Sequence, residues 1–214
     1  MTLHDGGTVL TTGTAPEQAA GGAILVHGRG ADARDILGLA PLIDTGGIAF
    51  MAPEAAGHAW YPYSFLAPIP DNEPWISSGL RAIEALLARF AEAGIAGERT
   101  VLLGFSQGAC LALEYAARHA RRFGGMVGLS GGLIGPPGTP RDYPGSLDGT
   151  PVFLGCSDQD PHIPRERVEE TAEVLTRMGA RVTMRLYPRM GHGINDDEVE
   201  FVKQMIAAMA GAGR

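Results

Sequence analysis

Short apolar runs alternate along the chain with longer stretches in which apolar residues recur every three to four positions. The runs are of strand length and predict strands at 22–28, which ends in glycine as a buried strand would, and at 47–55, 100–105, 124–132 and 151–157. Residues 181–188 alternate between apolar and polar and predict a strand of period two. The longer stretches predict helices at 77–94, 106–120, 165–180 and 195–211, with a shorter one at 33–44 that Pro41 interrupts. Asn195 is the expected N-cap of the last helix, with Glu198 three positions on.

Strands that alternate with helices favour parallel pairing through crossover connections, with helices on both faces of the sheet. No internal repeat or linker divides the sequence, so we expect one α/β domain over residues 1–214. Residues 1–20 are expected to form a peripheral strand or a mobile N-terminus. Residues 56–76 are rich in proline and aromatic residues and are expected to form a loop.

Composition narrows the class of protein only moderately. Of the 214 residues, 45% are hydrophobic and 19% are charged, which is typical of a globular chain, and the net charge of −7 gives no sign of a nucleic-acid-binding face. The two cysteines, Cys110 and Cys156, lie in apolar segments and are expected in the core. The N-terminus has no signal-peptide pattern and no run is long enough to span a bilayer, so the predicted location is the cytoplasm.

One motif carries chemistry. Gly104-Phe105-Ser106-Gln107-Gly108 lies between a predicted strand and a predicted helix. In that setting G-x-S-x-G forms a nucleophile elbow, a sharp turn that exposes the serine hydroxyl at the carboxyl edge of the sheet. The alternative is a plain helix cap. The strand–turn–helix context favours a nucleophile at Ser106.

A serine nucleophile needs a base, and the base needs an orienting acid. His192 follows the last predicted strand and lies between two glycines, so it is the predicted base. Asp158 and Asp160 both follow the strand at 151–157, and their position alone does not decide which of them is the acid. The order serine, aspartate, histidine is that of the α/β-hydrolases.

Two backbone amides are candidates for an oxyanion hole. One is the N–H of Gln107, directly after the nucleophile, and the other is the N–H of Arg29, in the glycine-containing loop after the strand at 22–28. A dinucleotide-binding interpretation of Gly28-Arg29-Gly30 lacks the third glycine at the required spacing.

The loop at 56–76 follows a strand and should overhang the same edge of the sheet. Its aromatic residues are expected to form an apolar wall for substrate, or alternatively a small core that only fixes the loop. Three apolar residues from other loops flank that edge. The predicted pocket residues are therefore Trp60, Tyr61, Tyr63, Phe65, Trp75, Leu133, Ile163 and Met190.

Taken together, the segments VHGRGAD, GFSQGA, SDQDPHIP and GHGI resemble the phospholipase/carboxylesterase family of α/β-hydrolases. The resemblance runs over nearly the whole chain. It implies a single-domain α/β-hydrolase fold with Ser106 as nucleophile, His192 as base and the amides of Arg29 and Gln107 as oxyanion donors. It also assigns the acid to Asp160, the aspartate directly before the proline of a D-P-x-[IV]-P stretch.

The sequence thus predicts a serine carboxylesterase that hydrolyses small esters, short-chain or aromatic, through an acyl-enzyme. The alternatives are an acyl-thioesterase or lysophospholipase and a catalytically silent ligand-binding protein on the same fold. No metal and no cofactor are expected. The expected partner is a small-molecule ester, without nucleic acid or stable membrane insertion, and a homodimer is left open.

Overall fold

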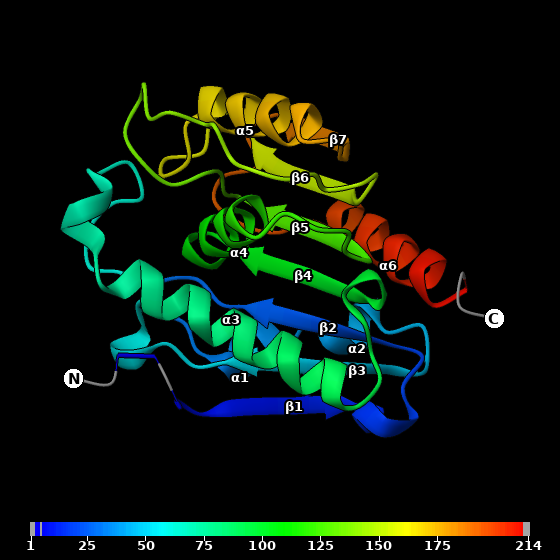
Figure 1. Cartoon of the computed structure of the whole chain (residues 1–214). Coiled ribbons are helices and arrows are strands. Elements are labelled where there is room, and N and C mark those ends of the chain that lie inside the picture. The colour runs from blue at the N-terminus through cyan, green and yellow to red at the C-terminus, as the bar shows by residue number, and fades with distance from the viewer. Residues whose placement is uncertain (1–2, 5, 212–214) are drawn as a thin grey trace.

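Seven strands form one sheet in the computed structural model, which describes residues 3–4 and 6–211 (Figure 1). The strands are β1 Val9–Gly13, β2 Gly21–Val26, β3 Ile48–Pro53, β4 Thr100–Phe105, β5 Gly125–Leu129, β6 Pro151–Ser157 and β7 Arg181–Tyr187. Their order across the sheet is β1-β3-β2-β4-β5-β6-β7. All neighbouring pairs are parallel except β1 and β3, where Val9 lies opposite Pro53. The predicted mostly parallel sheet is confirmed.

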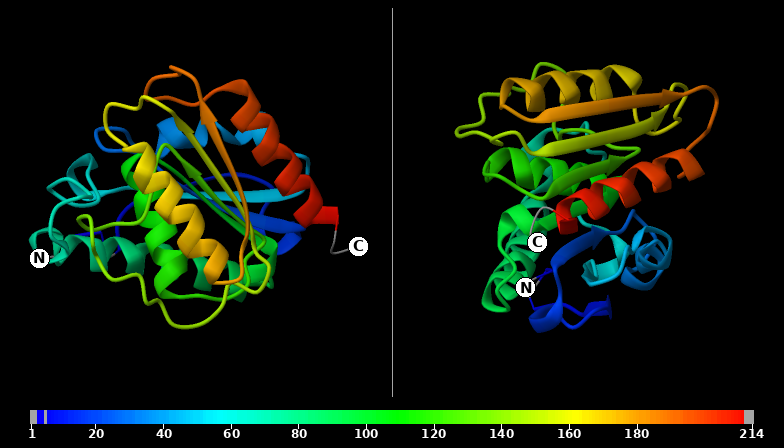
Figure 2. Two further views of the ribbon diagram at one scale, coloured as in Figure 1. Left: turned by 90° about the horizontal axis from the view of Figure 1, so that it is seen from above. Right: turned by 90° about the vertical axis from the view of Figure 1, so that its right-hand side faces the viewer.

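Helices cover both faces of this sheet, as predicted (Figure 2). The helices are α1 Ala33–Leu37, α2 Ala40–Ile43, α3 Trp75–Glu92, α4 Gln107–Arg118, α5 Arg165–Arg177 and α6 Asp196–Gly211, with 3₁₀ turns at Pro16–Gln18, Ala56–His58, Ile69–Asn72 and Gly97–Arg99. The α3, α4 and α5 side chains pack in one hydrophobic core, and those of α1, α2 and α6 pack in the other. The two cores are separated by the sheet because successive side chains of a strand point to opposite faces.

The interior strands are buried over their whole length or nearly so, whereas the two edge strands are not. The β2 and β3 residues are buried throughout, while β1 is half-buried at Val9 and Leu10 and exposed beyond them. This explains why the interior strands could be predicted from their apolar runs, whereas the polar strand β1 could not. Residues 1–2 and 5, which belong to the predicted N-terminal segment 1–20, lie outside the described residues.

Helix boundaries agree with the predictions apart from small shifts. Pro41 lies inside α2, and the predicted helix at 33–44 is two short helices, α1 and α2. The helix expected at 77–94 begins earlier, at Trp75, directly after Pro74. At the start of α6, Asn195 and Glu198 form the predicted capping box: each side chain accepts a hydrogen bond from the other residue's backbone N–H, at 3.0 and 2.9 Å.

Parallel strands bring the loops after β2, β3, β4, β6 and β7 to one edge of the sheet. In Figure 1 this carboxyl edge lies on the left, the side toward which the arrowheads of β2 and β4 point. The predicted nucleophile, acid, base and oxyanion amides all lie in or next to these loops. Both cysteines, by contrast, are free thiols in the core, as expected.

Candidate active site

Ser106 lies at the sharp turn between β4 and α4. Its backbone φ of +54° is in the left-handed region, which is strained for a residue with a side chain and is one mark of a nucleophile elbow. The turn is possible because its flanking residues have no Cβ. A Cβ on Gly104 would overlap the carbonyl of Gly108, and one on Gly108 would overlap the carbonyl of Val26 in β2. These glycines therefore permit helix and strands to approach closely.

Ser106, His192 and Asp160 form a continuous chain of hydrogen bonds. The Ser106 Oγ lies 2.8 Å from His192 Nε2, and His192 Nδ1 lies 2.8 Å from Asp160 Oδ2. Because a carboxylate can only accept, Nδ1 carries the proton and Nε2 is free to accept the serine proton. The Asp160 side chain is fully buried, whereas that of His192 is 19% exposed and lines the cavity described below.

Asp160 is held in its ionised form by its surroundings. Burial acts to raise its pKa, but hydrogen bonds from the His192 imidazole and from the amides of His162 and Ile163 outweigh burial, and the pKa lies below its ordinary value. Those two amides donate to Asp160 Oδ1 at 2.8 and 3.0 Å. An anionic carboxylate in this place can stabilise an imidazolium at His192, as the predicted role of the acid requires.

Asp158 has a different place. Its Oδ1 accepts a hydrogen bond of 2.7 Å from the backbone N–H of Arg189, which has a positive φ of +51°. Next to it, Ser157 Oγ accepts from the N–H of Gly191 at 3.2 Å. The loop after β6 therefore supplies the partner of the His192 ring and also fixes the turn that presents it.

The candidate oxyanion amides adjoin Ser106. Gly28 packs against Ser106, since a Cβ on Gly28 would lie 3.4 Å from that of Ser106, and Arg29 follows it directly. The loop is fixed by Gly30, whose N–H donates to the carbonyl of His58 at 2.7 Å and whose φ is +79°. Gln107 is the first residue of α4, where backbone N–H groups are unpaired and the helix dipole favours negative charge.

The side chains of Arg29 and Gln107 form hydrogen bonds with the loop at 56–76, called the aromatic loop below. Gln107 Oε1 accepts from the N–H of Trp60 at 2.8 Å and its Nε2 donates to the carbonyl of Tyr61 at 2.9 Å. The Arg29 guanidinium donates to three successive carbonyls, those of Tyr61, Pro62 and Tyr63, at 2.8 to 3.0 Å. Neither side-chain role was predicted, because hydrogen bonds to loop carbonyls leave no pattern in the sequence.

A cavity of about 430 Å³ opens beside Ser106. Its lining combines loop residues with the predicted nucleophile and base: Arg29, Tyr61, Pro62, Tyr63, Ser64, Phe65, Ser106, Gln107, Cys110, His162, Ile163 and His192. A volume of this size suits a small organic ligand.

Four of the eight predicted pocket residues line this cavity, namely Tyr61, Tyr63, Phe65 and Ile163. The other four, Trp60, Trp75, Leu133 and Met190, are not among its lining residues. Cys110 and His162 do line it, although Cys110 was expected only to fill the core. Cys110 lies one helical turn after the nucleophile, a spacing that could have indicated a shared face.

Trp60 and Trp75 instead form an aromatic cluster around His4, in which Trp75 is partly buried. Trp60 is fully buried, and its indole N–H donates to the carbonyl of His27 at 2.9 Å. Its ring centroid lies 5.0 Å from that of His4, and the Trp75 ring lies 5.5 Å from His4. The small core that was the alternative for this loop is therefore present next to the cavity wall. His4, in the segment expected to be peripheral or mobile, is itself buried.

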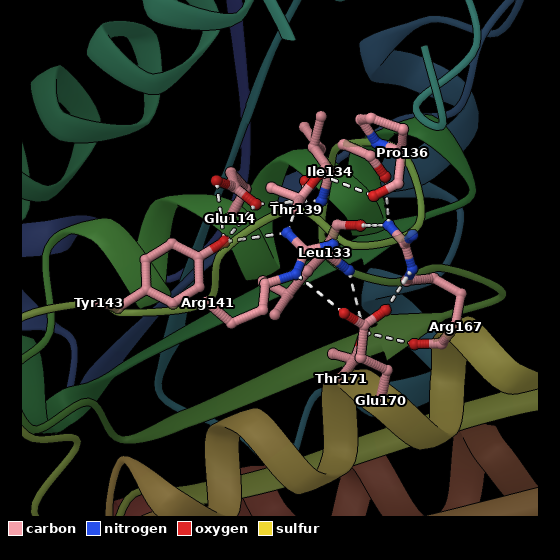
Figure 3. A network of polar contacts seen from close by, with 11 residues as sticks. Glu114, Leu133, Ile134, Pro136, Thr139, Arg141, Tyr143, Arg167, Glu170 and Thr171 are labelled. Atoms are coloured by element: carbon pink, nitrogen blue, oxygen red, sulfur yellow. Dashed lines mark hydrogen bonds and ion pairs between the residues drawn. The ribbon is translucent and has the colours of Figure 1, made fainter. Parts of the chain in front are cut away.

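Leu133 belongs to a polar network that also connects to the aromatic loop; Figure 3 shows its contact with Arg167. The buried Arg167 of α5 donates to the carbonyls of Leu133 and Gly135, each at 2.6 Å, and pairs with Glu170 at 2.8 Å. The Gly135 N–H in turn donates to the carbonyl of Phe65 at 2.7 Å. The loop after β5 and the aromatic loop are thus fixed to each other and to α5. Met190, the remaining residue, places its sulfur against the amide of the Asn195 cap.

Two kinds of feature are absent from the described residues, a metal site and a membrane-spanning helix. No three His, Cys, Asp or Glu side chains among them are grouped as metal ligands. No helix formed by them is long and apolar enough to cross a membrane.

Comparison with known proteins supports the interpretation of this geometry. A family model described as Phospholipase/Carboxylesterase matches residues 11–210, nearly the whole chain. The chain belongs to this family. The crystal structure of a phospholipase/carboxylesterase from Dyadobacter fermentans DSM 18053 superposes with a TM-score of 0.92 at 38% identity and covers 97% of this chain and 99% of that one. The predicted resemblance and the predicted α/β-hydrolase fold are confirmed.

Relatives in the phospholipase/carboxylesterase family include acyl-protein thioesterases. Acyl-protein thioesterase 1 of Gibberella zeae is 34% identical over 124 residues, which are 56% of this chain and 52% of that protein. The one from Saccharomyces cerevisiae is 28% identical over 150 residues, 64% of this chain and 63% of that protein. The chain thus matches between about half and two thirds of these relatives' length. The carboxylesterase of Bacillus cereus shares the fold, with a TM-score of 0.75 at 20% identity.

Proposed function

We propose that this member of the phospholipase/carboxylesterase family is a serine carboxylesterase that hydrolyses small carboxylic esters through an acyl-enzyme. The observation that carries the proposal is the hydrogen-bonded chain from Ser106 through His192 to Asp160, with the serine at a strained strand-to-helix turn beside a cavity. If Ser106 had only a packing role, these features would not be expected to occur together. Membership in the family supports ester or thioester substrates.

In the proposed mechanism, Ser106 Oγ attacks the ester carbonyl carbon while His192 Nε2 accepts the hydroxyl proton. The carbonyl oxygen becomes an oxyanion that accepts hydrogen bonds from the backbone N–H groups of Arg29 and Gln107, each donor contributing about 3 kcal/mol. When the tetrahedral intermediate collapses, the bond to the alcohol oxygen breaks and His192 gives it the proton. Water then attacks the acyl-enzyme by the same route and frees the acid and the serine.

The size of the cavity supports small substrates. Residues 61–65 of the aromatic loop form one side of its wall, and hydrogen bonds from Arg29, Gln107 and the Gly135 N–H hold this loop in place. An extended acyl chain would need a groove, whereas a volume of about 430 Å³ suits short-chain or aromatic esters.

Hydrolysis of p-nitrophenyl esters from acetyl to palmitoyl, with a Ser106→Ala control, tests the proposal. We expect activity confined to short chains and a loss of at least about 10³-fold in the variant. A rise in kcat/KM up to palmitoyl would contradict the small-substrate proposal and favour the acyl-thioesterase or lysophospholipase alternative. Failure of a fluorophosphonate probe to label Ser106 would instead indicate a catalytically silent binding protein.

A further inference from the structure

The side chain of Arg29 contributes a permanent positive charge to the catalytic cavity. The residue is exposed, it lines the cavity, and it directly follows the glycine that packs against Ser106. Among the ion pairs formed by the described residues, none involves Arg29. Its three partners are backbone carbonyls, which are neutral. They satisfy three of the five guanidinium N–H donors and leave the charge uncompensated.

The other described residues that line the cavity offer no counter-charge. None of them is Asp or Glu, and their polar side chains include the imidazoles of His162 and His192. An imidazole is neutral or cationic and never an anion. The one carboxylate of the catalytic chain, Asp160, is fully buried behind His192 and is occupied by it. The cavity is therefore electropositive in a protein whose net charge is −7.

The arginine is also held still. A free arginine side chain loses about 2 kcal/mol of rotamer entropy when it binds a ligand. Bonds of 2.8 to 3.0 Å to the carbonyls of Tyr61, Pro62 and Tyr63 fix the guanidinium before any substrate arrives. A neutral side chain could also donate hydrogen bonds to these loop carbonyls. Holding the loop therefore does not by itself require the positive charge of Arg29.

We propose that the esters this enzyme hydrolyses best carry a carboxylate, which the Arg29 guanidinium attracts and orients inside the cavity. This inference rests on the proposed esterase function and narrows its substrate class. A charge-assisted hydrogen bond to a fixed guanidinium should raise kcat/KM for an anionic ester about tenfold or more over a neutral ester of the same length.

Two matched pairs of esters test the inference on either side of the scissile bond. Mono-p-nitrophenyl adipate against p-nitrophenyl hexanoate compares a carboxylate with a methyl group at the end of a six-carbon acyl chain. 3-Acetoxybenzoate against phenyl acetate compares the leaving groups. The readout is the ratio of kcat/KM within each pair, measured at low and at raised ionic strength. We expect wild-type enzyme to favour the anionic ester in at least one pair, and added salt to reduce the preference.

Three variants assign the preference to a residue. Because Arg29 also holds the loop, Arg29→Met is expected to lower activity on both esters of a pair, so the ratio rather than the rate is decisive. The preference should disappear in Arg29→Met, survive in part in Arg29→Lys, which keeps the charge, and persist in Arg177→Met. Arg177 is exposed at the far end of α5 from the site and controls for the overall charge.

Two results would contradict the proposed carboxylate preference and leave the proposed esterase function intact. If neutral esters are hydrolysed with dependence on Ser106 but wild-type enzyme favours them in both pairs, the proposed carboxylate preference is wrong. The same holds if Arg29→Met lowers both members of a pair by the same factor, which would make Arg29 a loop clamp only. Absence of Ser106-dependent hydrolysis of all four esters would refute the esterase function and this inference with it.

Discussion

The buried carboxyl of Glu198 should make the stability of the protein depend on pH. The side chain is fully buried at the start of α6, where Oε2 accepts the N–H of Asn195. Its other oxygen, Oε1, has no partner among the described residues and packs directly against the backbone of β6, where a Cβ on Gly155 would overlap it. Burial raises the pKa of Glu198 from 4.5 to about 7 despite the hydrogen bond from Asn195.

The sign and size of the effect follow from this difference in pKa. Below pH 4.5 the group is protonated in both the folded and the unfolded chain, and its contribution is fully present. As the pH rises toward 7, the unfolded chain releases this proton while the folded chain retains it, so unfolding is increasingly favoured. At about 1.36 kcal/mol per pKa unit, the free energy of unfolding falls by about 3 kcal/mol between pH 4.5 and 8 and then levels off.

Glu198→Gln removes the titration and keeps the shape of the side chain. Its free energy of unfolding, measured by urea denaturation at half-unit steps from pH 4.5 to 8, should therefore differ from that of wild type by an amount that changes with pH. The variant gains about 3 kcal/mol relative to wild type across this range. Any cost of burying the amide is a constant offset, because that group does not titrate.

Glu200→Gln, which removes an exposed carboxyl from the same helix, is the matched control and should leave the pH dependence unchanged. A difference between wild type and Glu198→Gln that stays constant from pH 4.5 to 8 would refute the reasoning. It would mean that the carboxyl titrates alike in the folded and the unfolded chain.

Two further predictions concern the site and its scaffold. Asp158→Ala removes the acceptor of the Arg189 N–H and should lower kcat about tenfold with little change in KM. Asp158→Asn keeps an acceptor oxygen and should retain most of the rate in the same assay. Equal losses in both variants would contradict this positioning role. Gly108→Ala forces a Cβ onto the carbonyl of Val26 and should lower the free energy of unfolding by about 3 kcal/mol; Gly193→Ala, where nothing lies within 4 Å, should not, and similar denaturation curves for the two variants would count against the close approach.

Most of the fold could be predicted from the sequence because its interior strands are buried on both faces. Every residue of β2 and of β3 is buried, so these strands appear as continuous apolar runs with helices between them. The nucleophile elbow could be predicted for the same kind of reason. A close approach of helix and strand excludes a Cβ at Gly104 and Gly108, and that exclusion is visible as glycine in the sequence.

The choice between Asp158 and Asp160 could not be derived from spacing. Both follow β6 and both contact the loop that carries His192, one through the backbone of Arg189 and the other through the imidazole itself. Two residues apart in an irregular turn, the side chains have no periodicity that assigns them a direction. Only the family resemblance distinguished them, and the hydrogen bond to His192 is made by Asp160.

The cavity wall was predictable only in part. Trp60 and Tyr61 are adjacent and both are buried, yet Tyr61 lines the cavity and Trp60 is not among its lining residues. The reason lies in hydrogen bonds that no residue pattern encodes. The indole N–H of Trp60 finds its acceptor in the carbonyl of His27, and this contact directs the ring beneath the loop.

The arrangement of the loop also links substrate selection to the proposed oxyanion hole. The carbonyl of Tyr61 accepts hydrogen bonds from the side chains of both Gln107 and Arg29, at 2.9 and 2.8 Å, and the backbone N–H groups of these two residues are the proposed oxyanion donors. A change that moves the Tyr61 carbonyl should therefore displace Arg29 and Gln107 together, along with their backbone N–H groups. Displacement of a donor from its preorganised position lowers the rate of acyl transfer even where the reacting groups are intact. Substitutions in the aromatic loop should accordingly change kcat together with substrate preference.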